Sequence, residues 1–353
     1  MVFFCLVGFF LYFCGMILIA PDKFKGTLDA ERVASGVADA LRECGVSDEI
    51  MCRPLADGGE GSQRVLLSEP RSVWPGVYVD GDEVVVVSAD VVGRGCFGNG
   101  IGLMERSSRQ LGEAMRCAMS LKPRRLTVAV GGTMCSDGGA GMLVALGCRF
   151  YDEAGNDISA GMCAERLRDI YSIDFCGLES MPTLEAMIDV EAELCTGELS
   201  AMDFAPQKAL PGEDISGLRE GLQRLSAMIT GRSRYDGAGG GIGFGLCSVL
   251  GAKGYLGAER AAASLPWERK PSIVITGEGK VDSQTVLGGK LVDRVVKAAE
   301  RSGAQAYIVC GTMEEGVPYS NVYRSDNYEG SVEERLAAAV REMVRCASWL
   351  REK

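Results

Sequence analysis

Apolar runs alternate with amphipathic stretches along the chain, and the two patterns follow one another in a fixed order. Nearly all-apolar runs predict buried strands at 16–20, 126–130, 272–276 and 306–310. Apolar residues at helical spacing follow, across loops, at 33–41, 142–146, 291–299 and 332–344. Ser331 and Glu334 form a capping box at the start of the last of these helices. The chain is therefore expected to repeat strand, loop and helix.

Strands that are apolar at nearly every position, joined by helices, are typical of parallel sheets covered by helices. We therefore predict an α/β fold with a flavodoxin-like or Rossmann-like parallel sheet and a second α/β domain. The pattern changes after residue 70, where 78–92 predict extended segments broken by glycines. We expect a discontinuous domain of residues 16–70 and 270–353, with residues 71–269 inserted as the second domain.

The first twenty residues form one uncharged apolar stretch, long enough to span a bilayer. They have no basic segment and no small-residue cleavage site, and 16–20 match a buried strand of a soluble sheet. We favour Met16 as the start of the protein, with residues 1–15 a non-native N-terminal extension. A membrane anchor at residues 1–20 is the alternative.

Composition removes several classes of function. The net charge of -11 gives no basic field for a nucleic-acid partner. The chain has no histidine, which excludes Ser-His-Asp and Cys-His catalysis and imidazole metal sites. Its fourteen cysteines show neither CxxC nor ladder spacing, so we expect reduced thiols and a cytoplasmic protein.

Glycines cluster beside acidic residues at the ends of predicted strands. The clusters lie at 57–61, 137–141, 236–245 and 277–279. Ligands of open α/β sheets bind at the carboxyl ends of the strands, and glycine lets backbone N–H groups approach an anion. One such cluster is as well explained by a tight turn, but four favour a phosphate and metal site. The chain lacks both the GxxxxGK[ST] and the GxGxxG signatures, so a P-loop protein and a Rossmann dehydrogenase lose support.

Phosphoryl transfer without histidine needs carboxylates for Mg²⁺ and for the hydroxyl, and cations for the transferring group. The loops supply both kinds of side chain. The candidates are Asp22, Lys25, Asp57, Glu60, Asp137, Lys208, Glu278, Asp282 and Lys290.

Six motifs follow one another along the chain in the order found in a known enzyme family. Residues 20–27 read A-P-D-K-F-K-G-T, similar to that family's A-P-D-S-F-K-G-S, and 54–61 match P-L-A-D-G-G-E-G throughout. Residues 131–142 resemble G-G-S-A-T-N-D-G-G-A-G-M. Shorter matches follow at 205–208 (A-P-Q-K), 237–241 (G-A-G-G-G) and 276–285 (T-G-E-G-K-V-D-S-Q-T). With these motifs the chain resembles the bacterial two-domain, glycerate 2-kinase-like type of the glycerate kinase family.

The resemblance implies two α/β domains with the active site in the cleft between them, and phosphorylation of D-glycerate by ATP and Mg²⁺ to a phosphoglycerate, the 2-phosphate being favoured. It implies four catalytic residues: Asp137, Lys25, Lys208 and Asp282. It implies binding of substrate or nucleotide by Asp22, Asp57, Gly58, Gly59, Glu60, Gly131, Gly132, Thr133, Gly138, Gly139, Glu278 and Gln284. Asp137 and Glu278 are the expected metal ligands. Glycerate is the expected partner, and a homodimer is left open.

Three departures from the family pattern matter for activity. For the family's D-V-D-N-P-L we expect the stretch 192–197, A-E-L-C-T-G, which lacks both aspartates. The family's T-S-S-Y-G-x-G becomes R-S-S-R-Q-L-G at 106–112, and 284–290 are one residue longer than Q-T-x-M-G-K. The alternative to an active kinase is therefore a catalytically impaired homologue that binds nucleotide or a small hydroxy acid. An oxidoreductase ranks third because the dinucleotide fingerprint is missing.

Overall fold

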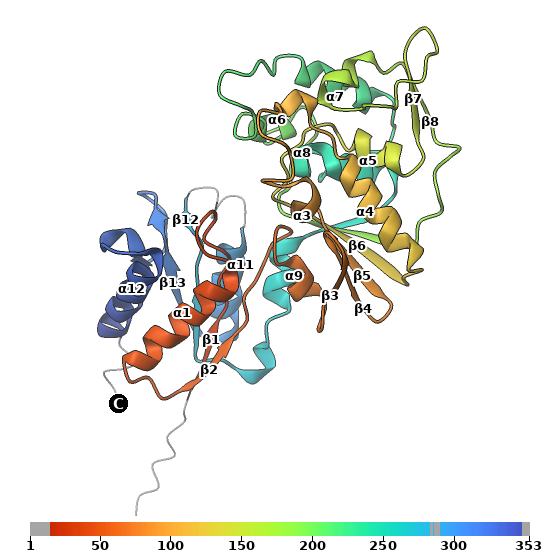
Figure 1. Cartoon of the computed structure of the whole chain (residues 1–353). Helices are drawn as coiled ribbons and strands as arrows, with labels where there is room; N and C mark the ends of the chain where they lie inside the picture. Colours follow the sequence, from red (N-terminus) through yellow and green to blue (C-terminus); the bar gives the residue numbers. More distant parts are fainter. Residues whose placement is uncertain (1–14, 283–284, 286–289, 348–353) are drawn as a thin grey trace, which may run out of the picture. The chain divides into compact units, whose positions relative to one another are not determined.

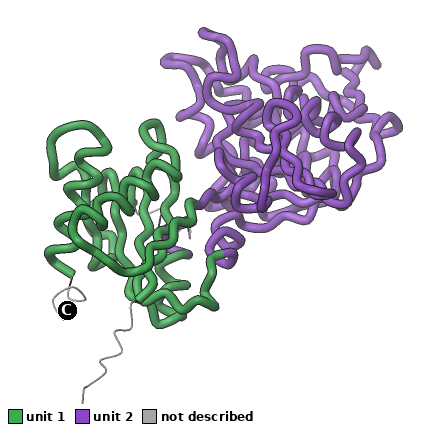
Figure 2. The backbone as a smooth tube through the Cα atoms, turned by 60° about the horizontal axis from the view of Figure 1, so that its bottom comes forward, with its two compact units in different colours: residues 1–54, 265–282, 295–353 green, residues 55–264, 283–294 purple. Residues whose placement is uncertain are grey.

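The computed structural model describes residues 15–282, 285 and 290–347. The chain divides into two compact units, coloured separately in Figure 2. Of the described residues, the first contains 15–54, 265–282 and 295–347, and the second contains 55–264, 285 and 290–294. Each unit has its own sheet and its own hydrophobic core. The predicted α/β fold is confirmed.

The first unit is built on a five-stranded, wholly parallel sheet with the strand order β15-β13-β11-β1-β2. Its strands are β1 (Met16–Ile19), β2 (Glu49–Cys52), β11 (Ile273–Thr276), β13 (Gln305–Cys310) and β15 (Val322–Arg324), with a separate parallel pair of β12 (Lys280–Val281) and β14 (Thr312–Met313). Its helices are α1 (Ala30–Glu43), α12 (Val332–Cys346), the short η4 (Trp267–Arg269) and η5 (Ser325–Asn327), and α11 (Leu291–Ser302), which starts in residues counted with the second unit.

Alternation along the central strands explains how this sheet is covered. Ile17 and Ile19 of β1 pack in one core with buried residues of α1 and α12, which contact each other (Figure 1). Leu18 is equally buried and faces the other side of the sheet. The helix α1 begins where Asp29 accepts a hydrogen bond from the N–H of Arg32, and α12 begins at the predicted capping box.

The second unit has a six-stranded sheet with the order β10-β9-β6-β5-β4-β3, in which β10, β9, β6 and β5 are parallel and β4 and β3 are antiparallel. Its strands are β3 (Arg71–Trp74), β4 (Val77–Asp80), β5 (Glu83–Val87), β6 (Arg125–Val130), β9 (Thr183–Ile188) and β10 (Lys253–Leu256), plus the separate antiparallel pair β7 (Arg149–Tyr151) and β8 (Ser172–Asp174). Its helices are α2 (Ser62–Leu66), α3 (Ala89–Val92), α4 (Arg109–Ser120), α5 (Ala140–Ala145), α6 (Ala201–Phe204), α7 (Leu218–Ala227), α8 (Ala238–Gly243) and α9 (Gly257–Ala263), with η1 (Leu103–Glu105), η2 (Ala164–Asp169) and the π-helix η3 (Phe244–Val249).

The large core of this unit lies on one face of the sheet, where α4, α5, α7 and α8 contribute buried residues. A smaller core on the other face joins Val85 and Val87 of β5 to Leu67 at the end of α2. This contact bears on the expected domain boundaries. Residues 55–70 were expected in the domain formed by the chain ends, but they lie in the second unit because α2 packs on β5.

The first fourteen residues, on which we predicted an extension or an anchor, lie outside the described residues. Of the helices in 15–282, 285 and 290–347, none combines the length and the apolar character that crossing a bilayer requires.

Candidate active site

The central strands β6 and β9 of the second unit end beside a crossing loop. Gly58, in the segment 57–61, lies over their carboxyl ends with φ +133°. A Cβ on Gly58 would lie 3.0 Å from the carbonyl oxygen of Met187 and 3.4 Å from that of Val130. A Cβ on Gly131, the first residue after β6, would lie 2.8 Å from the carbonyl carbon of Gly58. These glycines therefore let the predicted loops 57–61 and 131–141 pack backbone to backbone at the edge of the sheet where ligands bind.

Lys208 is a buried cation at this edge. It follows α6 and is 8% exposed, and its Nζ donates to the carbonyl oxygen of Cys135 at 3.0 Å and to Oγ1 of Thr133 at 3.3 Å. Both acceptors are neutral, so no bonded carboxylate cancels its charge. Burial lowers the pKa of Lys208 below its ordinary value of 10.5, and the carboxylates of Asp189 and Asp137 oppose this shift in part. Such a cation is suited to an anionic ligand.

The glycine run in α8 makes room for this ammonium group. Gly239, Gly240 and Gly241 all have positive φ, which interrupts the helix before η3. A Cβ on Gly240 would lie 2.2 Å from the carbonyl oxygen of Cys135 and 2.9 Å from Nζ of Lys208. The hydroxyl of Ser136 borders the same spot and has no hydrogen-bond partner in the described part of the chain. The loop after β6, Lys208 and the run 239–241 therefore converge.

Asp137 is fully buried, and its carboxylate holds the loop together. Oδ2 accepts hydrogen bonds from the N–H and the hydroxyl of Ser108, at 2.7 and 2.9 Å, and from the N–H of Gly141 at 3.1 Å. Oδ1 accepts from the N–H of Gly139 at 3.2 Å. Burial raises the pKa of Asp137, and these hydrogen bonds oppose the rise. Four donors from the protein leave this carboxylate little capacity for a metal ion or a substrate proton.

The other predicted residues of this unit line the same edge. Asp57 is half-buried and Glu60 is exposed, and the Glu60 carboxylate lies 3.5 Å from where a Cβ of Gly132 would stand. Gly138 and Gly139 take positive φ at the start of α5, and the N–H of Gly138 donates to the carbonyl oxygen of Gly240. Gly59 accepts a hydrogen bond from the hydroxyl of Ser62, which fixes the end of the loop.

Asp189 is an acidic residue at this edge that the sequence analysis missed. It directly follows β9, it is half-buried, and its N–H donates to the carbonyl oxygen of Val130. Its position also shifts the comparison with the family's D-V-D-N-P-L. Residues 189–194 read D-V-E-A-E-L and match the first aspartate, the valine and the leucine without a gap. The end of strand β9 is the signal that fixes the position of this segment. The segment begins three residues before the stretch 192–197, which we had compared with the same motif.

Four predicted residues lie in the first unit, at the carboxyl ends of β1 and β11. The N–H of Asp22 donates to the carbonyl oxygen of Gly277, and the N–H of Gly311 donates to that of Glu278. Lys25 is exposed, and its N–H lies 3.1 Å from where a Cβ of Gly279 would stand. The carboxylate of Asp282 pairs with Lys280 at 3.5 Å. Gln284, also predicted, lies outside the described residues.

The predicted metal site is not preassembled in the described residues. Within residues 15–282, 285 and 290–347, no group of three or more acidic or cysteine side chains is arranged to hold a metal ion. Glu278 is half-buried in the first unit, and Asp137 is engaged by Ser108 and the glycine amides. Mg²⁺ in kinases needs only one or two carboxylates beside the phosphates of its nucleotide.

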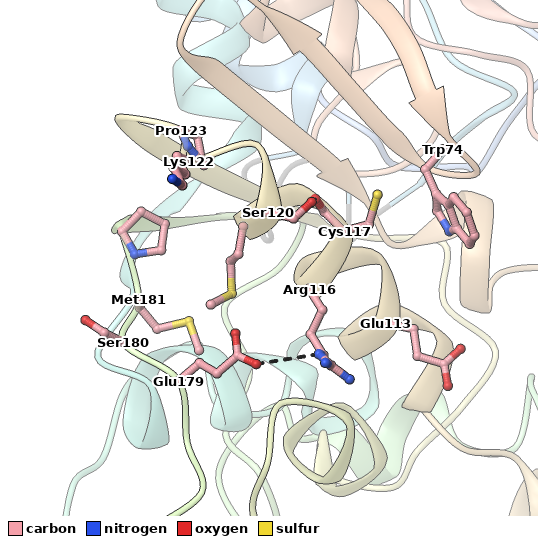
Figure 3. Close-up of a pocket in the computed structure, with 12 residues that line it drawn as sticks. Trp74, Glu113, Arg116, Cys117, Ser120, Lys122, Pro123, Glu179, Ser180 and Met181 are labelled. Atoms are coloured by element: carbon pink, nitrogen blue, oxygen red, sulfur yellow. Dashed lines mark hydrogen bonds and ion pairs between the residues drawn. The ribbon is translucent and has the colours of Figure 1, made fainter.

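A surface pocket of about 750 Å³ lies elsewhere on the second unit (Figure 3). It is bordered by Trp74, by α4 and by the loops that precede β6 and β9. Arg116 and Glu179 form an ion pair across it at 3.7 Å. None of the predicted site residues borders this pocket, so the converging loops remain the candidate site.

Comparison with known proteins finds similarity along nearly the whole chain. A family model described as the glycerate kinase family matches residues 17–345. A glycerate kinase of Bacillus subtilis is 30% identical over 84% of this chain and 85% of its own length. A glycerate 2-kinase of Escherichia coli K12 is 29% identical, with 85% of this chain and 86% of the relative covered.

A solved structure extends the likeness to three dimensions. A candidate glycerate kinase 2 from Salmonella typhimurium LT2 has a TM-score of 0.73 and 28% sequence identity, covering 96% of this chain and 99% of the other.

Proposed function

The chain belongs to the glycerate kinase family, and we propose that it transfers the γ-phosphate of ATP, with Mg²⁺, to a hydroxyl of D-glycerate, forming 2-phosphoglycerate. It is an enzyme of the phosphotransferase class with an alcohol group as acceptor. The preference for the 2-hydroxyl is supported by the Escherichia coli relative, which is named a glycerate 2-kinase.

One observation carries the proposal: a buried Lys208 whose ammonium group is hydrogen-bonded only to neutral oxygens, at the carboxyl ends of parallel strands and enclosed by glycine loops. Phosphoryl transfer concentrates negative charge on the equatorial oxygens of the transferring group. A cation bonded only to neutral oxygens in a dry site stabilises that charge more strongly than a cation in water. We propose that Lys208 binds either the transferring phosphate or the glycerate carboxylate, and that Lys25 binds the other of these two groups.

The chemistry requires one bond to form and one to break. The hydroxyl oxygen of glycerate bonds to the γ-phosphorus, the bond to the β–γ bridging oxygen breaks, and ADP leaves with that electron pair. The hydroxyl proton needs an acceptor. Asp137 is buried and engaged by four donors, so we assign the proton to Asp282 and give Asp137 the part of holding the loop.

Mg²⁺ neutralises charge on the phosphates when the nucleotide is bound. Because Asp137 is saturated, we keep Glu278 as the protein carboxylate for the metal and expect phosphate oxygens and water to supply the other ligands.

The alternative, an impaired homologue, loses its main support. It rested on the absence of the acidic residues of the D-V-D-N-P-L segment, and Asp189 and Glu191 supply acidic groups in the shifted register. We also propose that the enzyme works in the cytoplasm, which the free thiols of the twelve described cysteines support.

The test is an ADP-release assay on the purified chain with ATP, Mg²⁺ and D-glycerate, with the product identified by ³¹P and ¹³C NMR. We expect glycerate-dependent turnover that disappears with EDTA and falls about 100-fold or more in Lys208→Met. Lys253→Met, an exposed lysine of the same unit, is the matched control and should keep its activity. Nucleotide binding without turnover would reject the kinase and restore the impaired homologue.

A further inference from the structure

Arg106 is a buried arginine beside the candidate site, in the segment between η1 and α4, and it has no part in the proposal above. Its side chain is 8% exposed and lies over the ring of Phe97, with the guanidinium carbon 5.6 Å from the ring centre. All of its hydrogen bonds go to main-chain carbonyl oxygens. Nε and Nη2 donate to Ile101, at 3.1 and 2.8 Å, while Nη1 donates to Met134 at 3.1 Å and to Lys208 at 2.8 Å.

The two acceptors of Nη1 lie on the two segments whose relative position fixes the Lys208 ammonium group. Met134 stands between Thr133 and Cys135, whose oxygens accept from Nζ of Lys208. The second acceptor is the carbonyl of Lys208 itself. A single nitrogen of Arg106 therefore ties the main chain that carries the ammonium group to the turn that holds it. The planar guanidinium, anchored to Ile101 on its other side, sets this spacing rigidly.

Arg106 also adds charge near the site. Its guanidinium is bonded to no carboxylate. Burial raises the pKa of Glu213, but hydrogen bonds from main-chain N–H groups and the charge of Arg106 lower it below its ordinary value. Lys208 therefore has a second buried cation near it, and the charges of Asp189 and Asp137 act on its pKa in the opposite direction to that of Arg106. The region is suited to an anion.

The resembling family has threonine at the position of Arg106, in its T-S-S-Y-G-x-G motif, and a threonine side chain is too short to reach both carbonyls. We propose that Arg106 is a positioning residue for phosphoryl transfer, which fixes Lys208 against the turn 133–135 in the geometry that the transferring phosphate or the substrate carboxylate requires. This inference rests on the proposed function.

A double-mutant cycle tests the coupling. Arg106→Met should lower kcat about 10- to 100-fold, with a smaller change in the KM values, because a misplaced cation is felt mainly in the transition state. In the Lys208→Met background the same change should alter kcat by no more than about 2-fold, since nothing remains to be positioned. Multiplicative effects of the two changes would overturn the proposal.

Two further variants separate positioning from charge and from stability. Arg106→Lys keeps the charge without the fork, so it should be impaired nearly as much as Arg106→Met. Recovery of full activity in Arg106→Lys would show that charge alone acts. Arg224→Met removes another arginine of this unit that donates to a main-chain carbonyl, that of Ile170, and should leave kcat unchanged. Melting temperatures of all variants show whether any of them has lost its fold. If Arg106→Met has, the proposal is judged on the activity of Arg106→Lys.

A labelling experiment keeps this inference separate from the kinase assignment. The acylation rate of Lys208, followed by peptide mass spectrometry, should rise about tenfold in Arg106→Met while that of Lys253 stays constant. If the wild-type chain does not phosphorylate glycerate but this rise occurs, the kinase proposal fails and the positioning of Lys208 stands. An unchanged Lys208 rate in a folded Arg106→Met protein would reject the positioning.

Discussion

The burial of Lys208 carries a conflict between stability and function. The folded chain holds its ammonium group among neutral oxygens, and burial lowers its pKa. Replacing a buried charge with an apolar side chain of similar length is often stabilising. The residue is therefore expected to lower stability in exchange for the charge that catalysis needs, as residues of active sites often do.

The first prediction concerns Lys208→Met, which should be more stable than the wild type by about 1 kcal/mol at pH 7 while losing turnover. The pKa of Lys208 in the folded chain lies below the ordinary value of 10.5. The full cost of burying the charged ammonium group therefore applies at every pH below the folded pKa. Between the folded pKa and 10.5 the unfolded chain binds more protons, and wild-type stability rises with pH. The advantage of the variant should therefore shrink toward pH 10. Urea unfolding at pH 7 and pH 10 measures it, and an advantage that grows with pH would contradict the argument.

A second prediction concerns Asp137, whose carboxylate accepts three hydrogen bonds at Oδ2. In Asp137→Asn an amide group must either face the N–H donors or leave them unpaired. We expect a loss of about 2–4 kcal/mol in the free energy of unfolding. Asp214→Asn, at an exposed carboxylate that accepts from one main-chain N–H of Ser216, should cost less than about 1 kcal/mol. Unchanged stability with abolished turnover would return Asp137 to catalysis.

Asp137 and Asp189 show how much of the candidate site could be predicted from residue types and their spacing in the sequence. Acidic residues beside glycines were found from the sequence, but whether a carboxylate faces a ligand or its own loop depends on contacts such as those between Ser108 and Asp137. Those contacts join residues distant in the chain and leave no local pattern. Asp189 was missed because the stretch 192–197 was chosen by the threonine and glycine at its end, whereas the end of β9 fixes the register of the motif.

At the level of elements, the glycine run in α8 is the feature whose structure depends most on tertiary contacts. Three successive residues with positive φ are permitted because glycine lacks a Cβ. The sequence predicted a ligand loop here, and the structure places the run within an interrupted helix that leads into a π-helix. Such interruptions are frequent at functional sites.

The third prediction compares two glycines with nearly the same φ. Gly240 has φ +73° and Gly251 has φ +71°, so alanine should cause similar backbone strain of about 1 kcal/mol at either position. Only at Gly240 would the new methyl meet other atoms, the carbonyl oxygen of Cys135 at 2.2 Å, while Gly251 has open space. We expect Gly240→Ala to lose more than about 3 kcal/mol and most of its turnover. Equal losses in the free energy of unfolding, measured with urea, would show that backbone strain at positive φ alone accounts for the glycine run 239–241.

The strands and long helices could be predicted from the sequence more completely than the loops. The strand β1 and the helices α1 and α12 were expected from apolar runs, helical spacing and a capping box, because these signals are local. The short helices α2, α3 and α6 were not, since elements of four or five residues are held by packing and carry no complete period. The change of pattern after residue 70 reflects β4 and β5, of which β4 is antiparallel in a largely parallel sheet.

At the level of the whole molecule, the discontinuous organisation could be expected but its boundaries could not be located. The unit formed by the chain ends closes at residue 54 and resumes at 265. Nothing in the composition of residues 55–70 distinguishes them from the segment before. The packing of Leu67 against Val85 and Val87, and of Gly58 against the ends of β6 and β9, assigns them to the second unit. The expectation that the active site lies between the two domains stays a prediction.

The last prediction follows from the net charge of -11, since the proposed substrates are anions as well. At about 10 mM salt the Debye length is about 30 Å, so a substrate is repelled by the charge of the whole molecule. At about 150 mM it is about 8 Å, and an approaching anion responds mainly to charges as near as Lys208 and Arg106. We therefore expect kcat/KM for glycerate to rise between these concentrations of KCl, at saturating MgATP, while kcat stays nearly constant. If kcat/KM instead falls steadily with salt, the cations of the site attract the substrate from a distance, and the net charge of the molecule does not govern its capture.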